Sequence, residues 1–444
     1  MKTPTLCPRT MTDPTLKPPP HAPKGALATI FLIVFIDLMG FGIVLPNVLL
    51  YGKGFGIESE FVLVMIGASY SLFQFLFAPL LGRWSDRVGR RPALIFSQAG
   101  TLLGFFILFA AHFFEYADHR WSPIGITLVF LSRIIDGASG GNISIASAYI
   151  ADVTTPEKRA KGMGLIGAAF GLGFILGPAI GVVTARLFGL HIVPVVAMVF
   201  SATALVCTII FLKESRDPAH MPPPSTDLRR FTFNSLGKSV TRPVIGPLIL
   251  MMFVNAIAFA GMEQSLPLII YDRIYAPGAA PGTDLRAAAA TGSGFLYIFI
   301  GLIIAVMQGG LIGRLTKIFG SAKLIVVGPM LIAVGLYLIA VDVAWPWVWT
   351  GFAVGCFFLA IGSSVFNPSV QTAISQAAGP HEQGEVLGAS QGMASLARAF
   401  GPALAGLLYQ FLSPGAPYFF SAALCALVAI WAVLLMRRLP GRAG

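Results

Sequence analysis

The chain has 444 residues, of which 56% are apolar and only 11% are charged, whereas soluble domains carry about 25% charged residues. This composition excludes a soluble enzyme, and 35 Phe residues among long aliphatic runs exclude a disordered chain. The net charge of +11 would suggest a nucleic-acid partner in a soluble protein. In a membrane protein, positive charge instead indicates which loops lie on the cytoplasmic side of the membrane. We therefore expect no nucleic-acid partner. The Cys and His residues show no metal-binding spacing.

Residues 1–25 are rich in proline and basic residues and contain no apolar run of the length that a signal peptide needs. We predict a disordered cytoplasmic tail there. After it come twelve apolar runs, each close to the ~20 residues that a helix needs to cross a bilayer. They cover 27–50, 61–82, 92–113, 123–150, 161–185, 190–212, 242–270, 292–313, 322–341, 346–376, 385–412 and 416–436.

A polar, proline-rich stretch separates the sixth run from the seventh. We therefore predict an all-α integral membrane protein in which twelve transmembrane helices form two pseudo-symmetric six-helix bundles. The predicted parts after the tail are an N-terminal bundle at 26–212, a cytoplasmic linker at 213–240, a C-terminal bundle at 241–438 and a cytoplasmic tail at 439–444.

The basic residues predict how these helices are oriented. If the N-terminus is cytoplasmic, most of the 30 Lys and Arg residues fall in cytoplasmic segments, and the opposite loops carry only Lys53, Arg120, Arg186, Arg273 and Arg286. Such an excess of Lys and Arg is typical of cytoplasmic loops. We expect a monomeric, multi-pass protein of a bacterial inner (cytoplasmic) membrane, with both termini in the cytoplasm.

An internal repeat relates the two halves. Residues 82–89 follow the second run, residues 313–320 follow the eighth, and both segments begin and end with glycine. Two equivalent six-helix halves are the architecture of secondary transporters, which bind substrate between the halves near the middle of the bilayer. The sequence therefore predicts a transporter of a small molecule and not an enzyme. It contains no P-loop for ATP hydrolysis.

The loop after the second run concentrates charge in a short turn. Asp86 is expected near the start of the third helix, where a helix N-terminus favours an acid. Lys317 stands at the matching position of the second half, so the cluster is asymmetric. The glycines and charged residues of this loop are Gly82, Asp86, Arg87, Gly89, Arg90 and Arg91.

The fifth run carries Gly173, Gly177 and Gly181 at i,i+4 spacing. This spacing leaves one helix face without side chains, so that a neighbouring helix can approach closely. Pro178 removes one backbone hydrogen bond and permits a bend. We predict a closely packed, deformable seam.

These patterns resemble the major facilitator superfamily, and within it the drug:proton antiporters of the tetracycline-resistance group. The loop at 82–91 looks like the superfamily's signature between helices 2 and 3. This resemblance implies that the residues of the loop named above form a cytoplasmic gate, which latches the two halves when the cytoplasmic side is closed. Phe35–Pro46 and Ala148–Thr154 are similar to segments of helices 1 and 4 in tetracycline efflux proteins. The positions that look like the antiporter signature of helix 5, which implies a seam that restricts leakage, are Gly164, Gly173, Gly177, Pro178 and Gly181.

Two positions depart from the family pattern. Val182 stands where the helix-5 signature ends in a second glycine, and Gly104 stands where classical tetracycline pumps carry an aspartate. The second departure bears on whether tetracycline itself is the substrate, and not on the class of transporter.

Five ionisable residues lie well inside the predicted spans: Asp37, Arg133, Asp136, Glu263 and Arg398. A charge at a helix centre costs ~2.5–3.5 kcal/mol on insertion scales, so each side chain should face protein or a water-filled cavity. A carboxyl group whose surroundings alternate between dry and wet can bind a proton on one side and release it on the other. That exchange is the physical requirement for proton coupling.

Each of these residues also has a structural interpretation. Asp37 is the first candidate for proton or substrate handling, or else a buried structural acid. Glu263, toward the outer part of the seventh helix, binds a proton or a cationic substrate, or is an exposed acid. Arg133 and Asp136 are spaced i,i+3 and can pair; the resemblance implies that Arg133 tunes a proton-binding acid, with Asp136 as its structural partner. Arg398 is a candidate for an ion pair between the halves.

Uncharged polar residues inside the spans are candidates for the lining of a central cavity. These are Gln74, Asn142, Asn255, Gln264, Gln308, Gln371 and Gln391.

We therefore expect proton-coupled efflux of a small amphiphilic, drug-like compound of the tetracycline type, with protons as the coupling ion and no other cofactor. The alternative is a proton-linked importer or uniporter of a small metabolite. A third possibility is a membrane sensor that does not transport. The helix-5 glycines favour export.

Overall fold

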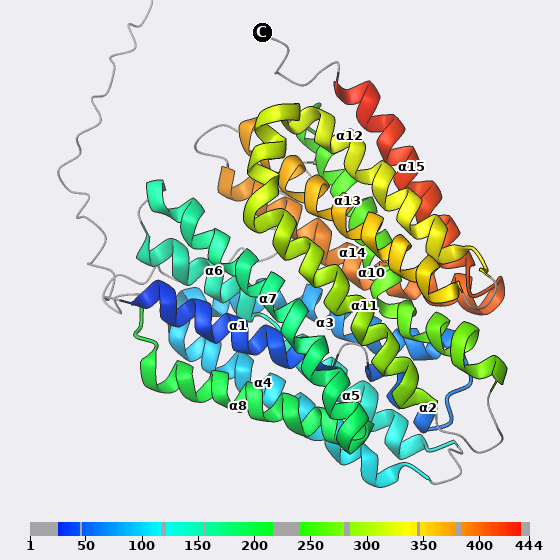
Figure 1. The fold of residues 1–444 in the computed structure, drawn as a ribbon. Coiled ribbons are helices and arrows are strands. Elements are labelled where there is room, and N and C mark those ends of the chain that lie inside the picture. Colours follow the sequence, from blue (N-terminus) through cyan, green and yellow to red (C-terminus); the bar gives the residue numbers. More distant parts are fainter. Residues whose placement is uncertain are drawn as a thin grey trace, which may run out of the picture.

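The computed structural model describes residues 25–44, 47–116, 121–154, 156–215, 240–278, 285–343, 347–377 and 383–436. Within these ranges all regular structure is helical. The predicted tails at 1–25 and 439–444 and most of the predicted linker lie outside them, apart from Gly25 and the linker's ends. Figure 1 shows two helical bundles side by side, the first coloured blue to green and the second green to red.

The predicted order of helices is confirmed. The first bundle comprises α1 (Ala26–Val44), α2 (Val48–Gly54), α3 (Glu60–Val88), α4 (Arg90–Ala111), α5 (Pro123–Ser139), α6 (Asn142–Val153), α7 (Pro156–Phe188) and α8 (Val193–Phe211). The second comprises α10 (Ile245–Ile270), α11 (Arg286–Val306), α12 (Ile312–Ala340), α13 (Val348–Ala377), α14 (Gln383–Phe411) and α15 (Ala416–Met436).

The described residues contain eleven helices or helix pairs that are long and apolar enough to cross a membrane. The remaining predicted run is α14, whose 29 residues match a span in length and include Arg398. The fourth run is divided, because α5 ends at Ser139 and α6 begins at Asn142 after two glycines.

The glycines that close the internal repeat have the same backbone role. Gly89 separates α3 from α4 with a φ of 101°, and Gly320 interrupts α12 with a φ of 75°. A residue with a Cβ rarely adopts such angles, so glycine is needed at both bends. The repeat in the sequence thus corresponds to a repeated bend in the chain.

The glycine stripe of α7 packs against α1 of the same bundle. A Cβ on Gly177 would lie 2.8 Å from the Cα of Gly42, and a Cβ on Gly42 would lie 3.0 Å from the carbonyl oxygen of Gly173. The two backbones therefore touch, as the i,i+4 glycines predicted. The helix continues through Pro178.

The seam between the bundles is formed by α3 against α14 and by α7 against α11. Val182 of α7 is buried there, and its Cγ2 occupies the place that a Cβ on Gly294 of α11 would need. The glycine that the helix-5 pattern lacks at position 182 is thus supplied by the facing helix, so the two helices still approach closely.

Candidate transport site

The charged residues expected inside the spans come from four helices of both bundles. Tyr70 of α3, which the sequence analysis did not single out, interacts electrostatically with Asp37 of α1, with Arg133 and Asp136 of α5, and with Arg398 of α14. Arg398 also interacts with Glu263 of α10. These five charged residues and Tyr70 therefore form one polar centre between the bundles. Tyr70 takes part in most of its interactions.

Arg133 and Asp136 form the ion pair that their spacing predicted. Nη1 of Arg133 lies 3.0 Å from Oδ2 of Asp136, and each side chain is 4% exposed. Asp136 also accepts a hydrogen bond from the side chain of Thr101. The guanidinium of Arg133 lies over the Phe105 ring, 5.5 Å from its centroid.

Gly104 of α4 lies directly beside Asp136 of α5. A Cβ on Gly104 would lie 2.9 Å from the Cβ of Asp136. The side chain of an aspartate at position 104 would therefore have no room, because α5 already places Asp136 beside it. At this place in the centre, the carboxylate of this chain is supplied by α5.

Asp37 is buried, with 6% of its surface exposed. Its Oδ1 has no hydrogen-bond partner among the described residues, and it interacts electrostatically with Asp136. The centre contains three carboxyl groups against the two guanidinium groups of Arg133 and Arg398. One bound proton would balance these charges.

Glu263 is not an exposed acid near the outer interface, because only 8% of its surface is accessible. Its backbone carbonyl oxygen accepts a hydrogen bond from the hydroxyl of Tyr297, which is itself buried. Glu263 is thus a buried member of the polar centre, and it interacts electrostatically with Arg398.

The predicted cavity-lining amides differ in their surroundings. Gln74 donates hydrogen bonds to the Tyr70 hydroxyl at 3.0 Å and to the Gly140 carbonyl oxygen at 3.1 Å. Asn255 is buried and donates to Asn367 at 3.3 Å. The other members are Gln264, which is buried, Asn142, which is half-buried, Gln308 and Gln371, which are exposed, and Gln391, whose side chain lies outside the described part of the structure.

A pocket of about 20 Å³ lies next to this centre. Six of its residues belong to the first bundle, and the seventh, Gln264, reaches in from α10 of the second. The lining consists of Phe41, Val44, Val48, Gly67, Tyr70, Arg133 and Gln264.

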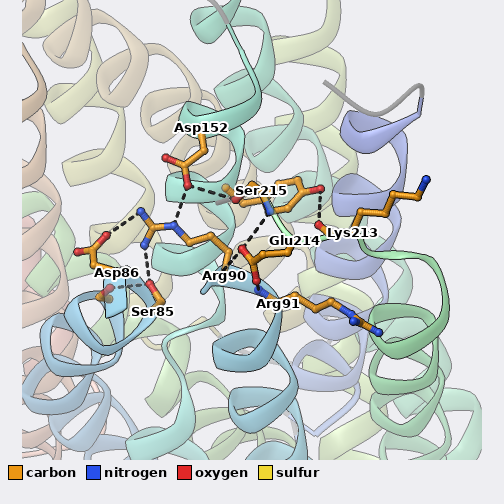
Figure 2. A network of polar contacts seen from close by, with 10 residues as sticks. Ser85, Asp86, Arg90, Arg91, Asp152, Lys213, Glu214 and Ser215 are labelled. Carbon is orange, nitrogen blue, oxygen red and sulfur yellow. Dashed lines mark hydrogen bonds and ion pairs between the residues drawn. The ribbon is translucent and has the colours of Figure 1, made fainter. Parts of the chain in front are cut away.

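The predicted gate loop contains a network around Arg90, which is 4% exposed (Figure 2). Its Nη2 lies 2.8 Å from Asp86, its Nε lies 2.9 Å from Asp152 of α6, and its Nη1 donates to Ser85 at 2.6 Å. These partners all belong to the first bundle. We call the end of the molecule that carries this network the basic end.

The expected position of Asp86 was wrong. Asp86 lies in the last turn of α3 and not at the start of the next helix. The acid at the N-terminus of α4 is Glu214, whose two carboxylate oxygens accept the backbone N–H groups of Arg90 and Arg91 at 2.9 and 3.0 Å (Figure 2). This is the placement that a helix N-terminus favours. Arg87 is exposed.

A second charged cluster lies at the opposite end of α3, which we call the Lys53 end. Lys53 contacts Glu60 at 3.1 Å and Asp272 of the second bundle at 3.6 Å, and Tyr409 donates to Asp272 at 2.7 Å. The sequence showed Lys53 only as one of the few basic residues in the loops there.

A further ion pair and an amide bridge join the bundles at the same end. Arg286 of α11 lies 2.8 Å from Glu115 of the first bundle. The Oε1 of Gln410 accepts hydrogen bonds from the Ser59 hydroxyl at 2.6 Å and from the backbone N–H of Phe61 at 2.9 Å. No motif marks these residues, since each partner lies far away in the sequence.

Comparison with known proteins identifies the family. The profile of the Major Facilitator Superfamily matches residues 30–354 and 288–444. The chain belongs to the major facilitator superfamily. It is therefore a multi-pass membrane transporter and not an enzyme.

Several relatives within the superfamily cover most of the chain. Major facilitator superfamily domain-containing protein 10 of Mus musculus is 26% identical over 89% of this chain and 90% of its own length. The class E tetracycline resistance protein of Escherichia coli is 30% identical over 85% of this chain and 86% of its own. Multidrug resistance protein 2 of Bacillus subtilis is 28% identical over 86% and 89%.

Solved structures support the same fold. The human organic anion transporter MFSD10 (TETRAN) superposes with a TM-score of 0.66 at 24% identity, covering 94% of this chain and all of that one. A POT family transporter in complex with a thioalcohol-conjugated peptide gives 0.71 at 14% identity, covering 94% and 96%.

Proposed function

We propose that this transporter exports a small amphiphilic organic compound in exchange for protons, and that Asp37 carries the coupling proton. The observation that supports this assignment is the buried Oδ1 of Asp37, which has no hydrogen-bond partner among the described residues. An unpaired charge in such a site is costly. The carboxyl group is therefore expected to bind a proton when the site is dry and to release it when water enters.

The charges of the centre support a role in coupling. With all groups ionised, Asp37, Asp136 and Glu263 outnumber Arg133 and Arg398 by one negative charge. Binding of one proton makes the centre neutral, and its release on the other side of the membrane restores the charge. Each proton that enters down the membrane potential supplies about 2.3 kcal/mol per 100 mV.

The relatives support export and an organic substrate. Two of them are a tetracycline resistance protein and a multidrug resistance protein, and a third is an organic anion transporter. In this proposal the basic end faces the cytoplasm of a bacterial cell, as the distribution of Lys and Arg predicts.

The experiment is a proton-release assay in everted membrane vesicles. A panel of amphiphilic drugs is added after an acid-inside pH gradient has formed, and acridine orange reports the gradient. We expect at least one drug to dissipate it with the wild type and none with Asp37→Asn, because the amide cannot carry the proton. Glu58→Gln, a change at an exposed acid, is the control and should behave as the wild type.

Two results would contradict the proposal. If a drug still dissipates the pH gradient in vesicles that contain Asp37→Asn, the proton site lies elsewhere. If no drug dissipates the pH gradient but one crosses the membrane down its own concentration gradient, the protein is an importer or uniporter on the same fold.

A further inference from the structure

The second half of the internal repeat leaves its basic residues unpaired. The segment 307–323 contains Arg314, Lys317 and Lys323 and no acidic residue. None of these three side chains forms an ion pair or a hydrogen bond with another described residue. In the first half, by contrast, Arg90 is held by two acids. The three cations of the second half therefore lack a counter-charge from the described part of the chain.

The helical segment that starts after Gly320 differs from its counterpart in the same way. In the first half, Glu214 accepts two backbone N–H groups at the equivalent start of α4. After Gly320, no acidic side chain of the described ranges takes that place. Because a helix N-terminus attracts anions, phosphate included, this turn has two reasons to bind a negative group and no described group that does so.

The unpaired cations lie at the depth of the lipid head groups. The segment after Gly320 runs to Ala340, whose carbonyl oxygen accepts a hydrogen bond from Arg273 at 2.8 Å. Arg273 follows Asp272, the partner of Lys53. Ala340 therefore lies at the Lys53 end, and Gly320 lies at the basic end. A helix of this length, about 30 Å, matches the hydrocarbon layer of a bilayer.

Exposed apolar side chains lie between the cations. Ile318 is 71% exposed and Phe319 is 48% exposed. Arg314, Lys317 and Ile318 have i,i+3 and i,i+4 spacing, so they share one face of the helix. Basic and apolar side chains in such proximity are typical of segments that lie in the membrane interface, where anionic lipids attract Lys and Arg.

From this arrangement we infer that the turn at 314–323 binds the head group of an anionic phospholipid. Phosphate oxygens accept hydrogen bonds from Arg314 and Lys317, and the acyl chains contact Ile318 and Phe319. The lipid thus supplies the counter-charge that acids supply in the first half. This inference goes beyond the proposed function, because it concerns the surface toward the lipid and requires neither protons nor a particular direction of transport.

The test measures binding of single lipid molecules to the full-length protein in detergent by native mass spectrometry. The probes are 1-palmitoyl-2-oleoyl-phosphatidylglycerol and the phosphatidylcholine with the same acyl chains, so they differ only in head group. Each basic residue near an anionic head group contributes about fivefold in affinity, so three residues predict a preference for phosphatidylglycerol on the order of a hundredfold.

Variants then locate the site. Arg314→Gln combined with Lys317→Gln should weaken the binding of phosphatidylglycerol about 25-fold and leave that of phosphatidylcholine unchanged. Arg87→Gln combined with Lys213→Gln removes two charges from exposed residues of the first bundle at the same end. This control should bind both lipids as the wild type does. A melting curve without added lipid verifies that each variant is folded.

Three results would overturn the inference. If the two lipids bind alike, the cations serve only to orient the helices. If the double change at Arg314 and Lys317 leaves the preference intact, the anionic lipid binds elsewhere. If the control weakens binding equally, total charge and not this turn sets the preference. Because the assay uses neither a proton gradient nor a drug, failure of the proposed antiport would leave its result unaffected.

Discussion

The two ends of the molecule hold their charges in different ways. At the basic end, the described partners of Arg90 all belong to the first bundle. At the Lys53 end, the ion pairs Lys53–Asp272 and Glu115–Arg286 connect the first bundle to the second. Helix α3 runs from one end to the other over 29 residues, or about 42 Å. Among the described contacts, the segment with a recognisable motif thus acts as a brace within one bundle, and residues without a motif join the bundles.

This difference fits a transporter whose bundles rock against each other. Contacts between rigid bodies must break when the site opens on that side, whereas contacts within one body persist. We therefore infer that the network of Arg90 maintains the shape of the first bundle in every state. The pairs at the Lys53 end stabilise only the states in which that end is closed.

The largest effect is expected from Arg90→Ala. The buried guanidinium bridges Asp86 and Asp152 and also donates to Ser85, and alanine removes all three contacts. A hydrogen bond to a charged group typically contributes about 1.5–3 kcal/mol, and Arg90 makes three such contacts, two of them with partly exposed acids. We expect a large fall in the midpoint of thermal unfolding in detergent. Arg87→Ala, three residues earlier and exposed, should change it little, and equal losses would contradict the role of a brace.

An intermediate effect is expected where α7 meets α11. Gly294→Ala would force its methyl group against Cγ2 of Val182, and such overpacking typically costs about 1–3 kcal/mol. Transport and thermal stability should both fall, and adding Val182→Ala should restore them by removing the clashing methyl. Gly313→Ala has open space around its Cβ and serves as the control. Failure of the second change to rescue the first would show that Val182 and Gly294 do not compensate each other.

The fold was largely predictable from the sequence, because the thickness of the bilayer fixes the length of each apolar run. The Arg133–Asp136 pair was predictable as well, since neighbours at i,i+3 share one helix face. The break between α5 and α6 was missed, because Gly140 and Gly141 lie within a continuous apolar run.

The centre could be predicted only in part. Its charged members stand out because ionisable residues are rare inside spans. Tyr70 was missed, because a tyrosine in an apolar helix is ordinary and only the folded structure shows that it interacts with four charged residues. Glu214 at the N-terminus of α4 and Arg286 beside Glu115 were missed for a similar reason. Each contact joins residues more than a hundred positions apart, and a single sequence carries no record of such pairs.

The smallest effect, and the most direct test of the comparison, is expected from Glu115→Gln at the Lys53 end. Both partners of the Glu115–Arg286 pair are partly exposed, at 15% and 11% of their side chains, so the pair contributes about 1 kcal/mol. This energy corresponds to a roughly fivefold shift toward states in which the Lys53 end is open.

Spin labels on Trp121→Cys and Pro277→Cys, both exposed and in different bundles, would report this shift as a larger share of long distances between the labels. The charge exchange of Glu115→Arg with Arg286→Glu should reverse the shift, because it rebuilds the pair. If the distance distributions of all three proteins coincide, this pair does not hold the bundles together, and Lys53–Asp272 and the bridge of Gln410 remain as the described polar contacts between them at this end.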